Sequence, residues 1–239
     1  MDDFDYNPKT KTYLLKEGVP YRGSRESIKP GMWKFRDKDG NGEITENDKT
    51  VIGNANPKLF GGLNNSVTWR GFDLSVFLTF SIGADVLNAT KLITAKSGIQ
   101  NYNALSVSDS DNRWMTINSQ GQIVTDPTEL AAINRGKTVA AYYDMEQGDN
   151  YIHSWGVEDA SYLKLSNITF GYTLPEKSLA KLGVKKCRFY FTANNIATWT
   201  NYSGFDPEVS TMRSPLTPGV DFGAYPLSRT FIFGANLTF

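Results

Sequence analysis

The sequence predicts an all-β fold of antiparallel strands that form a portion of a transmembrane β-barrel with long extracellular loops. First, residues 225–239 alternate apolar and mostly small or polar side chains with the two-residue period of a strand. Second, residues 60–82 repeat this alternation as a hairpin. Third, short connections alternate with very long ones, as in outer-membrane barrels, where aromatic residues also mark the ends of an apolar face. A soluble β-sandwich has the same alternation and remains the alternative.

The composition excludes several classes of function. The chain has 25 basic and 25 acidic residues, so it lacks the basic excess of a nucleic-acid-binding surface. No apolar run approaches the roughly 18 residues of a transmembrane helix. His153 is the only histidine and Cys187 the only cysteine, which leaves little for a catalytic triad or a histidine-rich metal site. We therefore expect neither an enzyme nor a nucleic-acid partner.

The first ten residues, MDDFDYNPKT, do not resemble a signal peptide, because they lack a basic segment followed by an apolar one. An outer-membrane protein must be exported. Either this chain is not an outer-membrane protein, or it begins partway through a longer protein.

Residues 1–58 are predicted to form a loop region, with a short strand at Thr12–Leu15, and they contain the sharpest local motif. Residues 37–48 follow the ligand spacing of an EF-hand-type calcium loop, in which alternate oxygen ligands converge on a hard cation and Gly42 permits a sharp turn. Side-chain oxygens would come from Asp37, Asp39, Asn41 and Asp48, the Glu43 carbonyl would contribute a further ligand, and Thr45 would contribute a hydroxyl or a bound water.

One position of this loop departs from the helical EF-hand. Asp48 stands where that motif has Glu, and a shorter carboxylate reaches the ion less easily with both oxygens. The alternative interpretation is an Asp/Gly/Asn turn that binds nothing. The sequence predicts a structural Ca²⁺ held by these residues.

The hairpin comes next. From Phe72, an apolar face of Phe72, Leu74, Val76, Leu78 and Phe80 alternates with Asp73, Ser75, Phe77, Thr79 and Ser81. The preceding strand is in phase with it through Leu63, Val67 and Trp69, and a tight turn at Arg70–Gly71 joins the two. Aromatic residues therefore lie at both ends of the apolar face.

The rest of the chain contains long loops and further strands. Residues 83–160 lack sustained periodicity apart from one helical piece at 128–134. A strand over 162–174 needs a bulge near Ser166, because Leu163 and Leu165 are out of phase with Ile168. A connection over 175–185, with room for one helical turn, leads to a strand over 186–195. A loop over 196–224 precedes the last strand.

Several stretches together resemble the carboxyl-terminal part of the SusC/RagA family of TonB-dependent outer-membrane transporters. They are the calcium-like loop followed by VIGNANPKLFGGLNNSVTWRGFDLSVFL, then EDASYLKLSNITFGYTLP, then NYSGFDPEVS, and finally YPLSRTFIFGANLTF. The similarity runs in order from about residue 30 to residue 239.

The resemblance implies a barrel of about 22 strands, of which residues 59–239 supply the last five or so. It implies an outer-membrane location, an amino-terminal plug and most of the barrel outside this chain, and energy from the TonB system. It also implies a SusD-like surface lipoprotein as partner in the import of oligosaccharides or peptides. In that topology the Arg70–Gly71 turn and residues 175–185 face the periplasm, whereas residues 1–58, 83–160 and 196–224 face outward.

Another class of protein remains open at this stage. A soluble secreted β-sandwich that binds glycans, with a structural calcium site, would also alternate and carry the 37–48 loop. Asp206 and Glu208 lie two residues apart, but the resemblance accounts for that stretch without catalysis.

Overall fold

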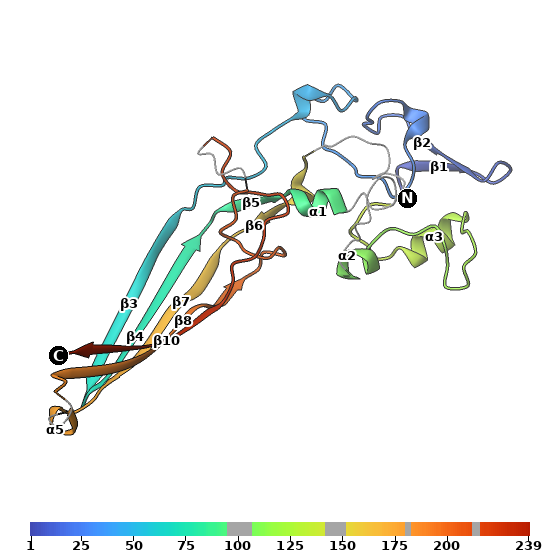
Figure 1. Ribbon diagram of the computed structural model, residues 1–239. Coiled ribbons are helices and arrows are strands. Elements are labelled where there is room, and N and C mark those ends of the chain that lie inside the picture. The colour runs from blue at the N-terminus through green and yellow to red at the C-terminus, as the bar shows by residue number, and fades with distance from the viewer. Residues whose placement is uncertain (95–106, 142–151, 180–182, 212–215) are drawn as a thin grey trace. The chain divides into compact units, whose positions relative to one another are not determined.

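The computed structural model describes residues 1–94, 107–141, 152–179, 183–211 and 216–239 (Figure 1). They form two compact units. One comprises Met1–Val51 with Lys91–Ile152, and the other comprises Ile52–Thr90 with His153–Phe239. The predicted loop regions 1–58 and 83–160 therefore contribute to a shared unit, whereas the long strands belong to the other.

The second unit is built on a five-stranded antiparallel sheet (Figure 1). Its strands, in spatial order, are β10 (Thr230–Thr238), β8 (Lys186–Thr200), β7 (Tyr162–Thr173), β4 (Phe72–Ile82) and β3 (Leu59–Trp69). These strands are 9 to 15 residues long, a range that includes the roughly 9 to 11 residues with which a tilted strand crosses a bilayer. The predicted set of five long strands is confirmed.

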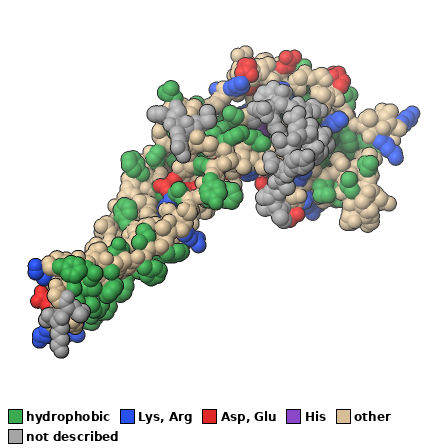
Figure 2. Space-filling model, in the orientation of Figure 1, with side chains coloured by type: hydrophobic (Ala, Val, Ile, Leu, Met, Phe, Trp, Pro, Cys, Tyr) green, Lys and Arg blue, Asp and Glu red, His purple; other side chains and the backbone are tan. Residues whose placement is uncertain are grey.

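Register brings the predicted apolar residues onto one face of this sheet, here called the apolar face. Val76 pairs with Ile168 and Leu74 with Phe170, and the row continues across β8 and β10. Figure 2 shows hydrophobic side chains gathered over these strands. The following apolar-face side chains are exposed: Leu63, Val67, Trp69, Phe72, Leu74, Leu163, Phe170, Phe189, Trp199, Phe231, Phe233 and Leu237. A soluble sandwich would bury this face, so its exposure favours the barrel interpretation.

Aromatic residues lie at both ends of the apolar face, as predicted. At the end with the Arg70–Gly71 turn, Trp69, Phe72, Tyr172 and Phe189 stand in one row across four strands. The Phe72 and Tyr172 ring centroids are 4.4 Å apart. At the other end, Phe80 and Trp199 both pair with Leu163. This arrangement matches the two aromatic girdles of a membrane barrel.

The bulge predicted near Ser166 is confirmed. The register of β7 against both neighbours shifts between Leu165 and Asn167, and against β4 Ser166 is an extra residue. Against β8 the extra residue is on β8, where Asn195 and Ile196 lie opposite Ser166 alone. The insertion of Ser166 places Leu165 opposite Leu78, on the apolar face. Because side-chain direction has a period of two, a single extra residue moves the remainder of a strand to the opposite face.

The opposite face of the sheet, here called the polar face, carries a hydrogen-bonded network. Arg188 donates two hydrogen bonds to the Asp73 carboxylate, at 2.9 and 2.6 Å. Gly171 lies between their strands, and a Cβ there would come within 2.5 Å of both side chains. Thr169 bonds Thr192 at 2.9 Å. Satisfied polar groups on this face suit a water-facing barrel interior.

The Arg70–Gly71 turn has the backbone geometry of a tight hairpin. Trp69 pairs directly with Phe72, and the two intervening residues have φ of 48° and 88°. Positive φ at both central positions is the type I′ arrangement that matches strand twist. A Cβ on Gly71 would lie 2.8 Å from the Thr173 carbonyl oxygen.

Gly71→Ala is therefore expected to lower the free energy of unfolding by about 2 kcal/mol, since it combines left-handed strain with a backbone clash. The matched control is Gly183→Ala, because Gly183 has φ of 67° and nothing within 4 Å of its Cβ position. The guanidinium midpoints of the full-length proteins in detergent measure both changes. A loss at Gly71 no larger than at Gly183 would show that the contact with Thr173 is unimportant.

Two strand boundaries were predicted wrongly. β8 runs on to Thr200, because it resumes pairing with β7 beyond a bulge where Asn195 has φ of 53°. β10 begins only at Thr230, so residues 225–229 are not strand. The cause is the same bulge, since β10 pairs with β8 no further than Asn194, and beyond it the side-chain amide of Asn195 donates to the Ser228 carbonyl.

The predicted loops 83–160 and 196–224 also contain structure that the sequence did not indicate. β5 (Asp85–Asn88), β6 (Val157–Asp159) and β9 (Val220–Asp221) form a three-stranded sheet in the order β6-β5-β9. These strands are too short to show periodicity. The connection after β7 holds α5 (Glu176–Leu179), the expected helical turn.

The first unit has short elements. β1 (Phe4–Asn7) pairs with β2 (Thr12–Leu15), so the predicted strand has a partner that was missed. α3 (Pro127–Ile133) confirms the predicted helical piece, and Asp126 caps it. The described residues further contain α1 (Ala89–Thr94), α2 (Val107–Asp111) and the short 3-10 helices Arg25–Ser27 and Glu46–Asp48, with Ser154–Gly156 in the second unit. No helix in the described ranges is long and apolar enough to cross a membrane.

Candidate functional site

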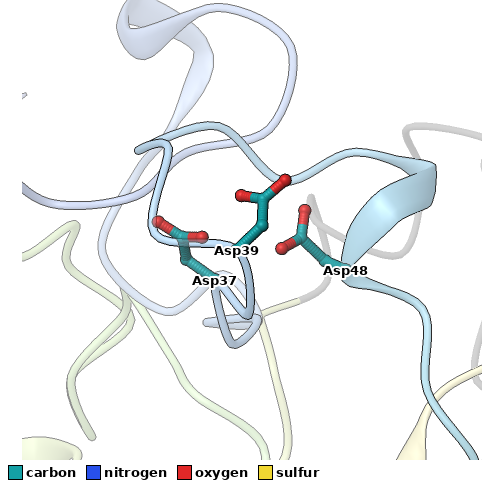
Figure 3. A group of neighbouring side chains, drawn as sticks. All are labelled: Asp37, Asp39 and Asp48. Atoms are coloured by element: carbon teal, nitrogen blue, oxygen red, sulfur yellow. The ribbon is translucent and has the colours of Figure 1, made fainter.

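The predicted calcium loop brings three carboxylates together. One oxygen from each of Asp37, Asp39 and Asp48 lies within 4.8 Å of the other two. Figure 3 shows Asp37 and Asp39 on the winding part of the loop and Asp48 at the short helix that follows. A single Ca²⁺ with oxygen ligands at about 2.3 to 2.6 Å spans opposite ligands at about twice that distance. The spacing of the three oxygens therefore fits one such ion.

The loop backbone holds the aspartates in place. Asp37 accepts hydrogen bonds from Gly40 at 2.7 Å and Gly42 at 2.9 Å. Both glycines have positive φ, 75° and 85°, which turns their N–H groups inward. Asp39 accepts from the backbone and the side-chain amide of Asn41. Each carboxylate oxygen has a second lone pair, so these bonds leave acceptor capacity for a cation.

Asp48 closes the loop from its far end. It accepts from the backbone N–H groups of Thr45 and Lys38, both at 2.7 Å. These backbone hydrogen bonds hold the pKa of Asp48 below its ordinary value. Thr45 caps the Glu46–Asp48 helix with its hydroxyl. Asp48 is therefore ionised at neutral pH, next to two further carboxylates.

The other predicted site residues have defined partners. The side-chain oxygen of Asn41 accepts from the backbone N–H of Glu43 at 2.7 Å. The Glu43 carboxylate is directed elsewhere, since it accepts from the Tyr21 hydroxyl at 2.9 Å, and that bond raises the pKa of Tyr21. The prediction that Glu43 would offer a cation only its carbonyl concerns the backbone and stays a prediction. Strand-like bonds between Tyr21 and residues 42 and 44 fix this side of the loop.

A second polar cluster, which the sequence did not reveal, lies at the end of the sheet opposite the Arg70–Gly71 turn. Lys164 is almost fully buried, with its side chain 6% exposed, and it forms ion pairs with Glu208 and with Asp206, the latter at 3.9 Å. The Tyr162 hydroxyl donates to Glu208 at 2.5 Å. We call these four residues the Lys164 cluster. A lysine interrupting YLKLSN was the only sequence signal for it.

The Lys164 cluster ties the segment after β8 to the sheet. Burial alone would raise the pKa of Glu208, but hydrogen bonds from Lys164 and Tyr162 hold it below the ordinary value. Nearby, the buried Tyr202 hydroxyl donates to Asp221 at 2.6 Å, and Tyr202 packs with Val86 and Ala160. Much of the predicted 196–224 loop is therefore anchored, although residues 212–215 lie outside the described part of the chain.

The sequence of this chain is similar to those of TonB-dependent receptors. No family model matches the chain. The chain is 36% identical over 215 residues to TonB-dependent receptor P3 of Formosa agariphila, a match that covers 88% of this chain and 19% of the relative. It is 29% identical over 246 residues to TonB-dependent receptor P39 of the same organism. It is 26% identical over 219 residues to TonB-dependent receptor SusC of Bacteroides thetaiotaomicron.

Solved structures agree on the fold. A structure of the RagAB peptide transporter matches 99% of this chain and 22% of its own, with a TM-score of 0.61 and 20% identity. The RagAB peptide importer in its open-open state matches 83% of this chain with a TM-score of 0.62. The chain spans about a fifth of the length of the curated relatives that it matches.

Proposed function

We propose that this chain forms the carboxyl-terminal strands of an outer-membrane nutrient transporter. Over most of its length the chain is homologous to TonB-dependent receptors, SusC among them. The identity of 36% to one such receptor over 88% of this chain carries the proposal. The exposed apolar face, its aromatic ends and the polar opposite face support it, because a barrel strand needs both lipid-facing and water-facing sides.

In this proposal the five-stranded sheet is one sector of a larger closed barrel. β3 and β10 are the edge strands of the sheet. Unpaired backbone groups in lipid cost several kcal/mol each, so both edges would pair with strands supplied by the remainder of the barrel. The Arg70–Gly71 turn and α5 would face the periplasm, and the connecting segments 1–58, 83–160 and 196–224 would face outward.

The transported cargo is proposed to be an oligosaccharide or a peptide, taken up with a SusD-like lipoprotein and driven by the TonB system. The naming of SusC and of the RagAB peptide importer among the matches supports this class. Growth of a deletion strain on purified oligosaccharides or on peptides as the sole nutrient tests it. We expect the deletion strain to lose growth on one of the two nutrient classes. The full-length gene should restore this growth in a strain that has TonB and should not restore it in a strain that lacks TonB. Unchanged growth on every member of both classes would contradict it.

We further propose that the 37–48 loop binds a structural Ca²⁺. The gathering of the Asp37, Asp39 and Asp48 carboxylates supports this, because like charges about 4 Å apart repel by roughly 4 kcal/mol at an effective dielectric of 20. A hard cation removes that repulsion. Magnesium fits less well, since it favours a small octahedral shell that retains several waters.

Asp48→Asn is expected to weaken Ca²⁺ binding at least about tenfold, since it removes one of three ligand charges while keeping an oxygen acceptor. Calorimetric titration of the full-length protein in detergent measures the affinity, and proteolysis within residues 37–48 measures loop order. The matched control is Glu46→Gln, because Glu46 pairs with Lys49 in the same loop and is not one of the three gathered carboxylates. Equal affinities in both variants, or no calcium-dependent protection, would leave only the turn interpretation.

A further inference from the structure

The first unit contains a cavity of about 300 Å³ that lies outside the barrel strands. This volume is at the lower end of the range for small-molecule sites, which begins at roughly 300 Å³. The aromatic side chains that line it come from segments far apart in the sequence: Phe4, Tyr21, Trp33, Phe35 and Trp114. Aromatic walls of this kind offer flat apolar surfaces on which the ring of a small ligand stacks.

The walls of the cavity are fixed by backbone hydrogen bonds. The backbone N–H of Trp114 donates to the Val139 carbonyl at 2.9 Å, and the backbone N–H of Ala141 donates to the Gly31 carbonyl at 2.8 Å. The Trp114 indole lies directly on Gly31, where any Cβ would come within 2.4 Å of the ring and φ is +91°. The glycine therefore permits the close approach that holds the indole in place.

This fixed indole presents an unsatisfied donor. The Trp114 Nε1 atom is buried and has no hydrogen-bond partner in the described part of the chain. An indole N–H is a donor only, and a buried donor without an acceptor costs free energy. Because this atom is inaccessible to solvent, the indole offers the cavity its aromatic ring rather than this donor.

The charge of the lining indicates the charge of a ligand. Four cationic residues line the cavity, Arg22, Lys29, Lys34 and Lys137, together with a single carboxylate, that of Asp3. Lys34 pairs with Asp3 at 2.8 Å, and the Lys137 ammonium donates to the Asp111 carbonyl. Arg22, with its guanidinium 6.0 Å from the centre of the Phe35 ring, places cationic and aromatic groups together. Guanidinium groups bind carboxylates through two parallel hydrogen bonds.

We propose that this cavity binds a small ligand that carries a carboxylate next to a ring. The ring stacks on the aromatic walls, and the carboxylate accepts from the cationic side chains. An acidic sugar and the carboxyl-terminal residue of a peptide share this chemistry. The site does not depend on the proposed transport function, because its residues belong to the first unit.

Calorimetric titration of the full-length protein in detergent tests the proposal with two matched pairs of probes. The first pair is glucuronate and glucose, and the second is N-acetylphenylalanine and its amide, so that each pair differs in the carboxylate. We expect one acid to bind with Kd near or below about 1 mM and at least about tenfold more tightly than its uncharged analogue. The pair that shows this difference identifies the ligand source. Failure of both acids to bind below about 10 mM, or equal binding of acid and analogue, would overturn the proposal.

Variants locate the binding in this cavity. Trp33→Leu, which removes an aromatic wall, and Arg22→Gln are each expected to weaken binding of the acid about tenfold. Trp69→Phe on the apolar face of β3 is the matched control and should leave the affinity unchanged. Unchanged affinity in both cavity variants would overturn the assignment. Nutrient uptake is scored separately, so that loss of uptake with retained binding contradicts the transport proposal, and retained uptake without binding contradicts this one.

Discussion

Val76→Arg is expected to lower the free energy of unfolding by about 2 to 4 kcal/mol, the cost of an arginine on the lipid face near the bilayer midplane. Val76 lies near the middle of β4, on the apolar face, opposite Asn65 on one side and Ile168 on the other. Its neighbours along β4 on this face are Leu74 and Leu78, which offer the guanidinium no acceptor, whereas Asn65 offers one side-chain oxygen. The measurement is the fraction of folded, heat-modifiable full-length protein and its guanidinium midpoint in detergent.

The matched control is Ser75→Arg, which places an arginine at the preceding residue of β4. Ser75 lies on the polar face, where its hydroxyl donates to the Asn64 side-chain oxygen at 3.1 Å. An arginine there would reach water in a barrel interior, so Ser75→Arg should cost less than about 1 kcal/mol. Equal losses at the two positions would refute the assignment of faces.

Lys164→Met is expected to lower the free energy of unfolding by about 3 kcal/mol, because removing one partner leaves the other charges of a buried ion pair uncompensated. The value is at the lower end of the usual range for buried pairs, since the Glu208 side chain is 37% exposed and stays partly hydrated. Lys177→Met, at an exposed lysine of α5, is the matched control and should change stability by less than about 0.5 kcal/mol.

The pH dependence separates a lost ion pair from lost packing. The folded pKa of Glu208 is lowered, so its contribution to stability is present above the unfolded pKa of about 4.3 and is lost as the pH falls through the lower folded value. In Lys164→Met the cation that lowers this pKa is absent, and protonated carboxyls need no counterion. The deficit relative to the parent protein should therefore shrink between pH 7 and about pH 4. A deficit independent of pH would assign the effect to packing alone.

The long strands were predictable from the sequence because the pattern that identifies each strand lies within its own residues. Two-residue alternation over 9 to 15 residues identifies a strand and its two faces without any knowledge of its neighbours. The Arg70–Gly71 turn and the Ser166 bulge followed from the same logic, since a break in phase has to be absorbed by an extra residue. The resemblance to TonB-dependent transporters added the class of barrel.

The gathering of carboxylates in the 37–48 loop was also predictable, because these residues lie within one short segment. Spacing along the chain fixes which oxygens converge when glycines supply the turn. The structure added that Asp37, Asp39 and Asp48 gather their carboxylates while the Glu43 side chain bonds Tyr21. That last contact joins residues 22 positions apart, and no local pattern encodes it.

Tertiary structure alone decided which residues distant in the sequence meet. Lys164 meets Glu208 across 44 positions, and Trp114 meets Gly31 across a longer separation still. The short strands β5, β6 and β9 exist only through such pairing, because two to four residues carry too little periodicity to mark a strand. Alternation determines a side chain's face from the chain itself, whereas ion pairs and cavities depend on chain packing that brings separate segments together.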